Sequence, residues 1–239
     1  MNKKYAFFDL DHTLLPVDSC GLWAYFLFTK CGSEEEALTQ KQKQFDEEYF
    51  HGQLDMEAFM DFEMAILHRF PRKELEVFRE EYLRRFIKPK VTKEALDLVQ
   101  KYKNAGYRTV MVTATHRFPV EPIAKLFHMD DLICSEPEED GKGEFTGGWI
   151  SHSFGPNKVT AVKNYMNAHG QEEKNWEGCV FYSDSKNDYP LLQTMEDYGG
   201  QPYAANPDPY LEKIAKEKRW PIVRLFDSVV APEPIISEK

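Results

Sequence analysis

The chain has 239 residues, 42% of them hydrophobic and 29% charged, which is typical of a soluble globular protein with one sizeable core and room for a smaller accessory domain. A formal net charge of -10, with no long Lys or Arg block, argues against a non-specific nucleic-acid binder or an anionic-membrane binder. Asp9 breaks the first apolar run before it reaches signal-peptide length, and no later run could span a membrane, so we expect a cytoplasmic protein.

The first predicted element is a strand, Tyr5 to Leu10, whose apolar residues run continuously instead of alternating. Such a run is typical of a parallel strand that is buried on both faces. It overlaps FFDLDHTLL, residues 7–15, which places the carboxylates Asp9 and Asp11 in an apolar setting. An unpaired charge removed from water is costly. The sequence therefore requires a partner that compensates these two charges.

Residues 16–90 contain no strand signal, and we expect them to be helical throughout. Ser33 and Glu36 have the spacing of a capping box before one helix, and Asp55 can cap the next. Apolar residues then recur at helical spacing between residues 75 and 86. A helical insert that leaves and rejoins the sheet is expected to form a lid beside the strand ends, with its Met and Phe side chains in the core of the lid.

The rest of the chain alternates strands with helices, which predicts an open α/β sheet with parallel strand order. Thr92, Pro119 and Asn157 are expected at the starts of three helices, and Gly106 at the end of the first. The acidic segment at 136–140 is expected to be a solvated loop, and Gly147-Gly148 is a hairpin signal. The strands predicted in this region are Arg108 to Thr113, Leu132 to Cys134 and Cys179 to Ser183.

Acidic and hydroxyl side chains follow several of these strands. Ligands bind open α/β sheets outside the carboxyl ends of the strands. So many carboxylates at one edge would repel one another strongly unless a cation lay among them. Oxygen ligands without His or Cys favour Mg²⁺, which commonly works with phosphate oxygens, and a carboxylate can also act as a nucleophile that forms an aspartyl-phosphate. The residues expected at this edge are Asp9, Asp11, Thr113, Asp184 and Asp188.

FFDLDHTLL resembles the DxDx[TV] signature of the haloacid dehalogenase superfamily, and VTATHRF, Lys158 and SDSKND are similar to its other three motifs in the same order. The resemblance covers the sheet domain nearly from end to end, and the position of the insert matches the phosphoserine-phosphatase-like branch. It implies a Rossmann-like three-layer core with an open parallel sheet, residues 1–15 and 91–239. It also implies an all-helical cap domain, residues 16–90, inserted after the first strand.

The resemblance implies a catalytic role for four residues. Asp9 matches the nucleophile and a metal ligand. Asp11 matches the general acid/base and would also bind the metal through its backbone carbonyl. Thr113 matches the hydroxyl that hydrogen-bonds the phosphoryl group, and Lys158 matches the cation that neutralises the charge developing there.

Metal and substrate contacts are implied in the same way. Asp184 is expected to bind Mg²⁺ directly, and Asp188 either supports the metal or holds Lys158. Asp18 resembles the acidic residue that receives a substrate amino group in phosphoserine phosphatases. The resemblance implies these substrate-binding residues: Asp18, Ala114 through its backbone N–H, Thr115 and Asn187.

The residues at two positions, Asp11 and the Ala114-Thr115 pair, restrict the activity that the resemblance implies. The dehalogenases of the superfamily lack a second acid at the position of Asp11, so the chain resembles the phosphate-handling members. Phosphoserine phosphatases usually follow the hydroxyl of the second motif with two glycines, whereas Ala114 and Thr115 stand here, as in histidinol-phosphatase-like relatives. The sequence thus predicts a Mg²⁺-dependent hydrolase of a small, amino-bearing phosphate monoester, with no nucleic-acid or membrane partner.

Other functions are compatible with parts of this pattern. A phosphotransferase or mutase would use the same aspartyl-phosphate with an alcohol as acceptor, and a non-catalytic protein could bind phosphorylated metabolites. A phospho-receiver domain carries its nucleophile on a later strand, so we rank it low. We assign no catalytic role to His12 or His116, and we expect Arg117 to cover its loop. The four cysteines lack CxxC or metal-ligand spacing, so we expect them to be reduced thiols: Cys20, Cys31, Cys134 and Cys179.

Overall fold

The computed structural model describes residues 3–171 and 175–228. A seven-stranded sheet in the order β4-β3-β2-β1-β5-β6-β7 lies at its centre; the β3–β4 pair is antiparallel and the other pairs are parallel. The strands are β1 (Tyr5–Phe8), β2 (Arg108–His116), β3 (Asp131–Glu139), β4 (Phe145–Ser151), β5 (Val180–Ser183), β6 (Gln201–Ala205) and β7 (Ile222–Val223).

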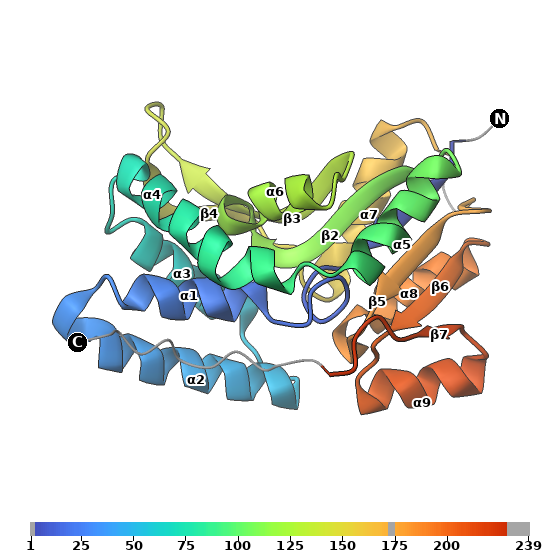
Figure 1. The fold of residues 1–239 in the computed structure, drawn as a ribbon, viewed down its shortest axis with the longest axis horizontal. Helices are drawn as coiled ribbons and strands as arrows, with labels where there is room; N and C mark the ends of the chain where they lie inside the picture. Colours follow the sequence, from blue (N-terminus) through green and yellow to red (C-terminus); the bar gives the residue numbers. More distant parts are fainter. Residues whose placement is uncertain (1–2, 172–174, 229–239) are drawn as a thin grey trace.

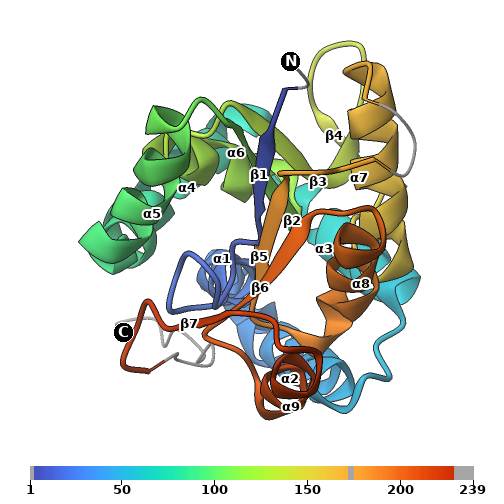
Figure 2. The same cartoon turned by 90° about the vertical axis from the view of Figure 1, so that its right-hand side faces the viewer.

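Helices cover both faces of the sheet, which gives three layers (Figure 2). Ala6 and Phe8 of β1 pack in one apolar cluster, and Tyr5 and Phe7 pack in the other, because alternate residues of a strand point to opposite faces. The predicted open α/β sheet is confirmed, and burial of β1 on both faces explains its continuous apolar run. The helices are α5 (Lys93–Asn104) and α6 (Arg117–Leu126) on the first face, and α7 (Pro156–Ala168), α8 (Tyr189–Asp197) and α9 (Pro209–Lys218) on the second.

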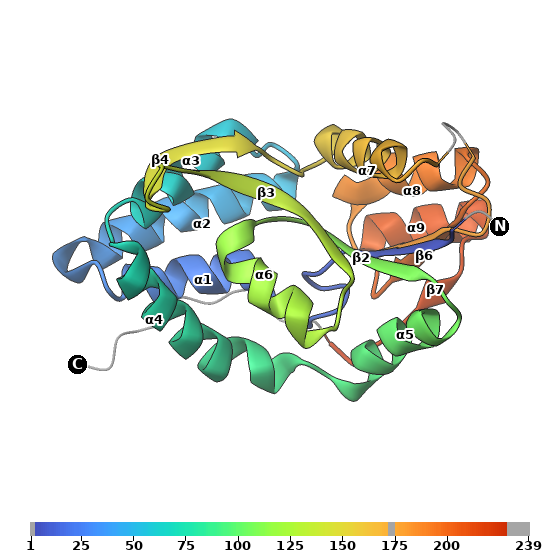
Figure 3. The same cartoon turned by 90° about the horizontal axis from the view of Figure 1, so that it is seen from above.

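Four helices between β1 and α5 form a cap beside the carboxyl ends of the strands (Figures 1 and 3). Residues 16–90, all of which the structure describes, contain no strand element. Trp23 of the cap contacts Phe118 of α6 with ring centroids 5.7 Å apart, so cap and sheet share one apolar cluster. The cap consists of α1 (Ser19–Phe28), α2 (Glu35–His51), α3 (Met56–Leu67) and α4 (Arg72–Tyr82), followed by a π-helical turn, Leu83–Ile87, and a 3-10 turn, Lys88–Lys90. Within the described residues, no helix has the length and apolar character needed to cross a membrane.

The region between α6 and α7 differs from its prediction. The segment at 136–140 is not a solvated loop, because residues 136–139 belong to β3. Two of its four carboxylates pair with arginines: Arg72 contacts Glu139 at 2.7 Å and Arg117 contacts Glu136 at 2.5 Å. The hairpin turn lies at 140–144 and not at Gly147-Gly148, which lie within β4. Arginines from α4 and α6 thus stabilise an acidic strand that its own sequence does not predict.

Some of the predicted helix starts agree with the structure and others do not. Asp55 and Thr92 cap α3 and α5 as expected, each accepting backbone N–H groups. The capping box at Ser33 is wrong, because a 3-10 turn, Gly32–Glu34, precedes α2, whose N-cap makes no side-chain hydrogen bond. α6 begins at Arg117, two residues before Pro119. Asn157 lies inside α7 instead of capping it; the helix begins at Pro156, whose fixed φ suits a first helical position.

The strands β6 and β7, which the sequence does not predict, hold the loop that follows β1. Asn206, directly after β6, donates from Nδ2 to the carbonyls of His12 at 2.9 Å and Thr13 at 3.1 Å. Its Oδ1 accepts the backbone N–H of Leu225 at 2.6 Å. One side chain therefore ties the acidic loop after β1 to the far end of the sheet.

We predict that Asn206→Ala lowers the free energy of unfolding by about 2 kcal/mol, because the buried carbonyls of His12 and Thr13 lose their donor. Asn167→Ala, exposed on α7, is the control and should change the same quantity by less than about 0.5 kcal/mol. Chemical denaturation measures both values. Equal stability of the two variants would show that Asn206 does not hold the loop.

Candidate active site

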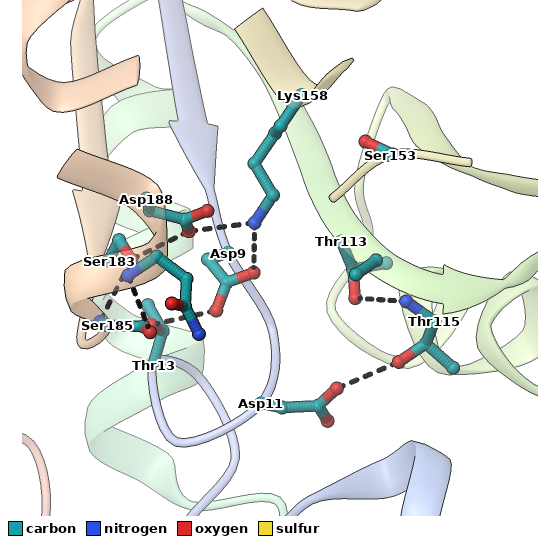
Figure 4. A network of polar contacts seen from close by, with 12 residues as sticks. Asp9, Asp11, Thr13, Thr113, Thr115, Ser153, Lys158, Ser183, Ser185 and Asp188 are labelled. Carbon is teal, nitrogen blue, oxygen red and sulfur yellow. Dashed lines mark hydrogen bonds and ion pairs between the residues drawn. The ribbon is translucent and has the colours of Figure 1, made fainter. Parts of the chain in front are cut away.

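β1 ends at Phe8, so Asp9 stands at the carboxyl edge of the sheet with its N–H donating to the carbonyl of Tyr182 at 3.0 Å. The chain then turns sharply: the carbonyl of Leu10 accepts three N–H groups, from residues 13, 14 and 15. His12 adopts a positive φ of 58° within this turn. The tight loop places both carboxylates, Asp9 and Asp11, at one edge (Figure 4).

Lys158 joins two of the predicted acids. Its Nζ lies 2.9 Å from Asp9 Oδ1 and 2.7 Å from Asp188 Oδ2. Lys158 is 3% exposed and Asp9 is 7% exposed, so the network lies away from water. Burial raises the pKa of Asp9 to about 7 although Lys158 opposes the shift. Burial alone would lower the pKa of Lys158, but Asp188 and Asp9 raise it above its ordinary value, and the side chain stays charged.

Two hydroxyl groups, those of Thr13 and Ser183, complete this network, and neither was among the predicted site residues. Thr13 Oγ1 lies 3.2 Å from Asp9 Oδ2 and 3.0 Å from Asp184 Oδ1, and it accepts the N–H of Asp184. Ser183 Oγ donates to Asp188 Oδ2 at 2.7 Å. Thr13 is the threonine of the DxDx[TV] signature, so the motif itself carried the signal. A single hydroxyl proton serves Asp9 and Asp184, which leaves one of these carboxylates without it.

The charges of this network do not balance within the protein. The network contains three carboxylates, Asp9, Asp184 and Asp188, and one ammonium group, which leaves two negative charges when all three carboxylates are ionised. Burial, Asp9 and Asp188 together raise the pKa of Asp184 well above its usual range. A divalent cation would supply the missing charge, and carboxylate oxygens are the donors that Mg²⁺ prefers. The donor set fits such an ion.

The side chain of Asp11 points away from Asp9 and toward Thr115 (Figure 4). Asp11 Oδ1 accepts the N–H of Ser19 at 2.7 Å, and Oδ2 accepts the hydroxyl of Thr115 at 2.9 Å. Within the described part of the chain, no three His, Cys, Asp or Glu side chains gather as a metal site. Burial raises the pKa of Asp11 to about 6, with Asp18 adding to the shift. A carboxyl group with this pKa can both give and take a proton near neutral pH.

The second motif lies at an irregularity of β2. The register between β2 and β3 shifts between Val112 and His116, which frees backbone groups from the ladder. The N–H of Thr115 donates to Thr113 Oγ1 at 3.1 Å, so the Thr113 hydroxyl keeps its own proton for another acceptor. Ser135 Oγ donates to the carbonyl of Ala114 at 2.6 Å. The structure thus brings Thr113 and Ala114 to the same edge as Asp9, while the Thr115 hydroxyl orients Asp11.

The other residues expected to contact substrate have different surroundings. Asp18 caps α1, with Oδ1 accepting the N–H groups of Cys20 and Gly21, and its Oδ2 accepts none from a described residue. The side chain of Asn187 is faced by the hydroxyl of Tyr49, a cap residue. Arg117 pairs with Glu136, in agreement with its expected covering role.

The sequence pattern of the haloacid dehalogenase-like hydrolases matches residues 6–193. Over 223 residues the chain is 36% identical to a histidinol-phosphatase from Neisseria meningitidis serogroup C (strain 8013), which covers 92% of this chain and 98% of that protein. A crystal structure of a protein of unknown function from Bordetella pertussis Tohama I has a TM-score of 0.85 and 35% identity over 95% of this chain and 100% of that chain.

A structure of phosphoserine phosphatase, described as a phospho-aspartyl intermediate analogue, has a TM-score of 0.65 at 18% identity and covers 95% of this chain and 96% of that chain. At this identity the likeness concerns the fold. It extends over both the sheet and the cap, so the Rossmann-like core with an inserted helical cap is confirmed.

Lys158→Met is expected to lower the free energy of unfolding at about pH 8 by about 3–5 kcal/mol, because Asp9 and Asp188 become unpaired buried carboxylates. The loss should be smaller at about pH 5, because burial raises the pKa of Asp9 to about 7 and this carboxylate is then protonated. Lys125→Met, whose side chain is 73% exposed on α6, is the matched control for denaturation. Equal losses in the two variants would contradict a buried ion-pair network at Lys158.

Proposed function

The chain belongs to the haloacid dehalogenase-like hydrolases and is a phosphatase; from this premise we propose that it hydrolyses a small phosphate monoester through a phosphoryl group carried on Asp9. One observation supports this proposal above the others. Asp9 lies at the edge of the sheet within 2.9 Å of a buried ammonium group, beside a second acid, Asp11, whose pKa is about 6. A nucleophile, a cation and an acid-base group therefore stand together.

Each step of the proposed reaction balances with residues of the chain. A carboxylate oxygen of Asp9 bonds to phosphorus while the bond from phosphorus to the ester oxygen breaks, and Asp11 gives its proton to that leaving oxygen. Asp11, now ionised, takes a proton from water, and the hydroxyl bonds to phosphorus as the bond to Asp9 breaks. Inorganic phosphate leaves, Asp9 returns as a carboxylate, and Asp11 is protonated again.

Three groups would stabilise the charge that develops on the phosphoryl oxygens. Lys158 contributes its ammonium, Thr113 its free hydroxyl proton, and Ala114 its backbone N–H. Mg²⁺, held by Asp9, Asp184 and the carbonyl of Asp11, would neutralise further negative charge there. Because Asp188 Oδ2 is shared between Lys158 and Ser183, we infer that Asp188 holds Lys158 in place.

The proposed substrate carries an amino group. Identity of 36% to a histidinol-phosphatase over nearly its whole length supports histidinol phosphate. Asp18 Oδ2 supports a basic group in the leaving alcohol, since it accepts no hydrogen bond from a described residue. Phosphoserine is the second candidate, and the Ala114-Thr115 pair in place of two glycines makes it the weaker one.

Asp9→Asn is predicted to lower the rate of phosphate release by about 10³-fold or more while the fold stays intact, because the amide is a poor nucleophile. Phosphate release from histidinol phosphate and phenyl phosphate, with Mg²⁺ and with a chelator, measures the effect. Asp97→Asn, whose side chain is 62% exposed on α5, is the control. Substantial Mg²⁺-dependent release by Asp9→Asn would remove Asp9 as the nucleophile.

Mg²⁺ is predicted to raise the Tm more at about pH 8 than at about pH 5. Burial raises the pKa of Asp9 from 3.8 to about 7, so the metal-free folded protein binds more protons than the unfolded chain and loses stability as the pH rises through this window. A cation bound to the ionised acids recovers that stability. Asp184→Asn should abolish the shift and Asp97→Asn should keep it; an unchanged shift in Asp184→Asn would refute the proposed ligand set.

A further inference from the structure

A second group of carboxylates lies in the cap, beyond the acids at the strand ends. Asp18 caps α1, Asp46 lies on α2 and Glu63 lies on α3. They are close enough to influence one another: burial raises the pKa of Glu63 to about 8, and Asp18 and Asp46 add to that shift. We call these three residues the acidic cap pocket. Asp18 also acts on Asp11, which connects the pocket with the catalytic acid.

The acidic cap pocket has only neutral hydrogen-bond donors among the described residues. Glu63, 5% exposed, accepts from Cys20 Sγ at 3.2 Å. Asp46 accepts from the hydroxyl of Tyr25 at 2.7 Å and the amide of Gln42 at 2.8 Å. No Lys, Arg or His in the described ranges forms an ion pair with any of the three carboxylates. Glu63 is buried and Asp18 and Asp46 are half-buried, so ionised carboxylates here are costly for the folded protein without a cation.

A small cavity adjoins Glu63 and contains unpartnered polar atoms, which is an observation independent of the carboxylates. It measures about 10 Å³, which is room for one water molecule or one other non-hydrogen atom. Glu63 and His116 are its polar lining residues, and both ring nitrogens of His116, which is 1% exposed, lack a hydrogen-bond partner. Burial lowers the pKa of His116 to about 3, so the ring is neutral and one nitrogen is an acceptor. The apolar side chains that line the cavity are Trp23, Ala24, Leu27, Phe28 and Ile66.

The unused polar atoms around the pocket are mostly acceptors. Gln42 Oε1 is buried without a partner, next to Asp46. Asp18 Oδ2 and Glu63 Oε2 accept no hydrogen bond from a described residue. The region therefore has more unused acceptors than donors and no positive charge among its described residues, and a protonated nitrogen supplies both donors and charge. A neutral ligand group could donate a hydrogen bond but would not compensate the negative charge, and an anionic group would add to it.

We propose that the acidic cap pocket binds a protonated nitrogen of the leaving alcohol, and that Glu63 is a specificity-determining residue which prefers phosphate esters of basic amino alcohols over those of neutral alcohols. The proposal rests on the proposed phosphatase function. It assigns opposite charges of the substrate to opposite ends of the site: the phosphoryl group lies at Lys158 and the basic nitrogen lies in the cap. Sugar phosphates and nucleotides lack such a nitrogen and fall outside the preferred class.

Glu63→Gln is the direct test, because the amide has the shape of the protonated acid and cannot become negatively charged. We measure kcat/KM for histidinol phosphate and for propyl phosphate, whose leaving alcohol is neutral. The ratio of the two values is expected to fall at least about tenfold in Glu63→Gln, mainly through KM for histidinol phosphate. Glu57→Gln, an exposed position on the same helix, should leave the ratio unchanged. Asp46→Asn, at a less buried position, should lower the ratio in the same direction.

Equal losses for both esters in Glu63→Gln would mean that Glu63 only supports the fold, and an unchanged ratio would remove it from recognition; either result overturns the proposal. Binding of histidinol, which has no phosphate, separates this outcome from failure of the proposed function. Calorimetry should detect binding to the unaltered protein and a loss of at least about tenfold in affinity in Glu63→Gln. If histidinol binds in this way but no ester is hydrolysed, the proposed hydrolysis of a small phosphate monoester through Asp9 fails while the pocket stands.

Discussion

The structure is organised around an excess of buried negative charge at the carboxyl end of β1. Three carboxylates lie in one network with a single ammonium group, which contacts two of them, and three neighbouring segments supply groups that stabilise this arrangement. α7 provides Lys158, β5 provides Ser183, and the loop after β1 provides Thr13 between Asp9 and Asp184. The cluster is buried, which strengthens every electrostatic interaction within it. A divalent cation and a phosphoryl group are complementary partners for such a site.

The cap repeats this electrostatic principle at a second place. Its helices bring together carboxylates that only neutral groups contact, next to a cavity with an unpartnered His116. A substrate with an anionic phosphate at one end and a basic nitrogen at the other would meet a cationic group at Lys158 and an acidic one at Glu63. A substrate with this charge pattern would be oriented by electrostatics as well as by shape.

The first and fourth motifs could be placed at the sheet edge from the sequence, because each of them follows a strand with a continuous apolar run. Tyr5–Phe8 and Val180–Ser183 are buried on both faces, and both lead into their acids at once. The sequence did not predict β3 in full, because its acidic residues need Arg72 and Arg117 from elsewhere in the chain. Nor did it predict Glu63, which lies on a helix whose apolar residues gave no reason to single out one acid. Both the full length of β3 and the surroundings of Glu63 depend on contacts between segments that are distant in the sequence.

The central claim is that the phosphoryl group is transferred from the ester to Asp9 and forms a covalent bond with it before water releases phosphate. The most direct measurement is to mix the protein and Mg²⁺ with a phosphate ester carrying a radiolabelled phosphoryl group, quench in acid during turnover, and map the labelled peptide. The account predicts an acid-stable label on the peptide that contains Asp9, which appears and decays with turnover and is absent from Asp9→Asn. Turnover without a labelled protein, or with the label on another residue, would contradict it.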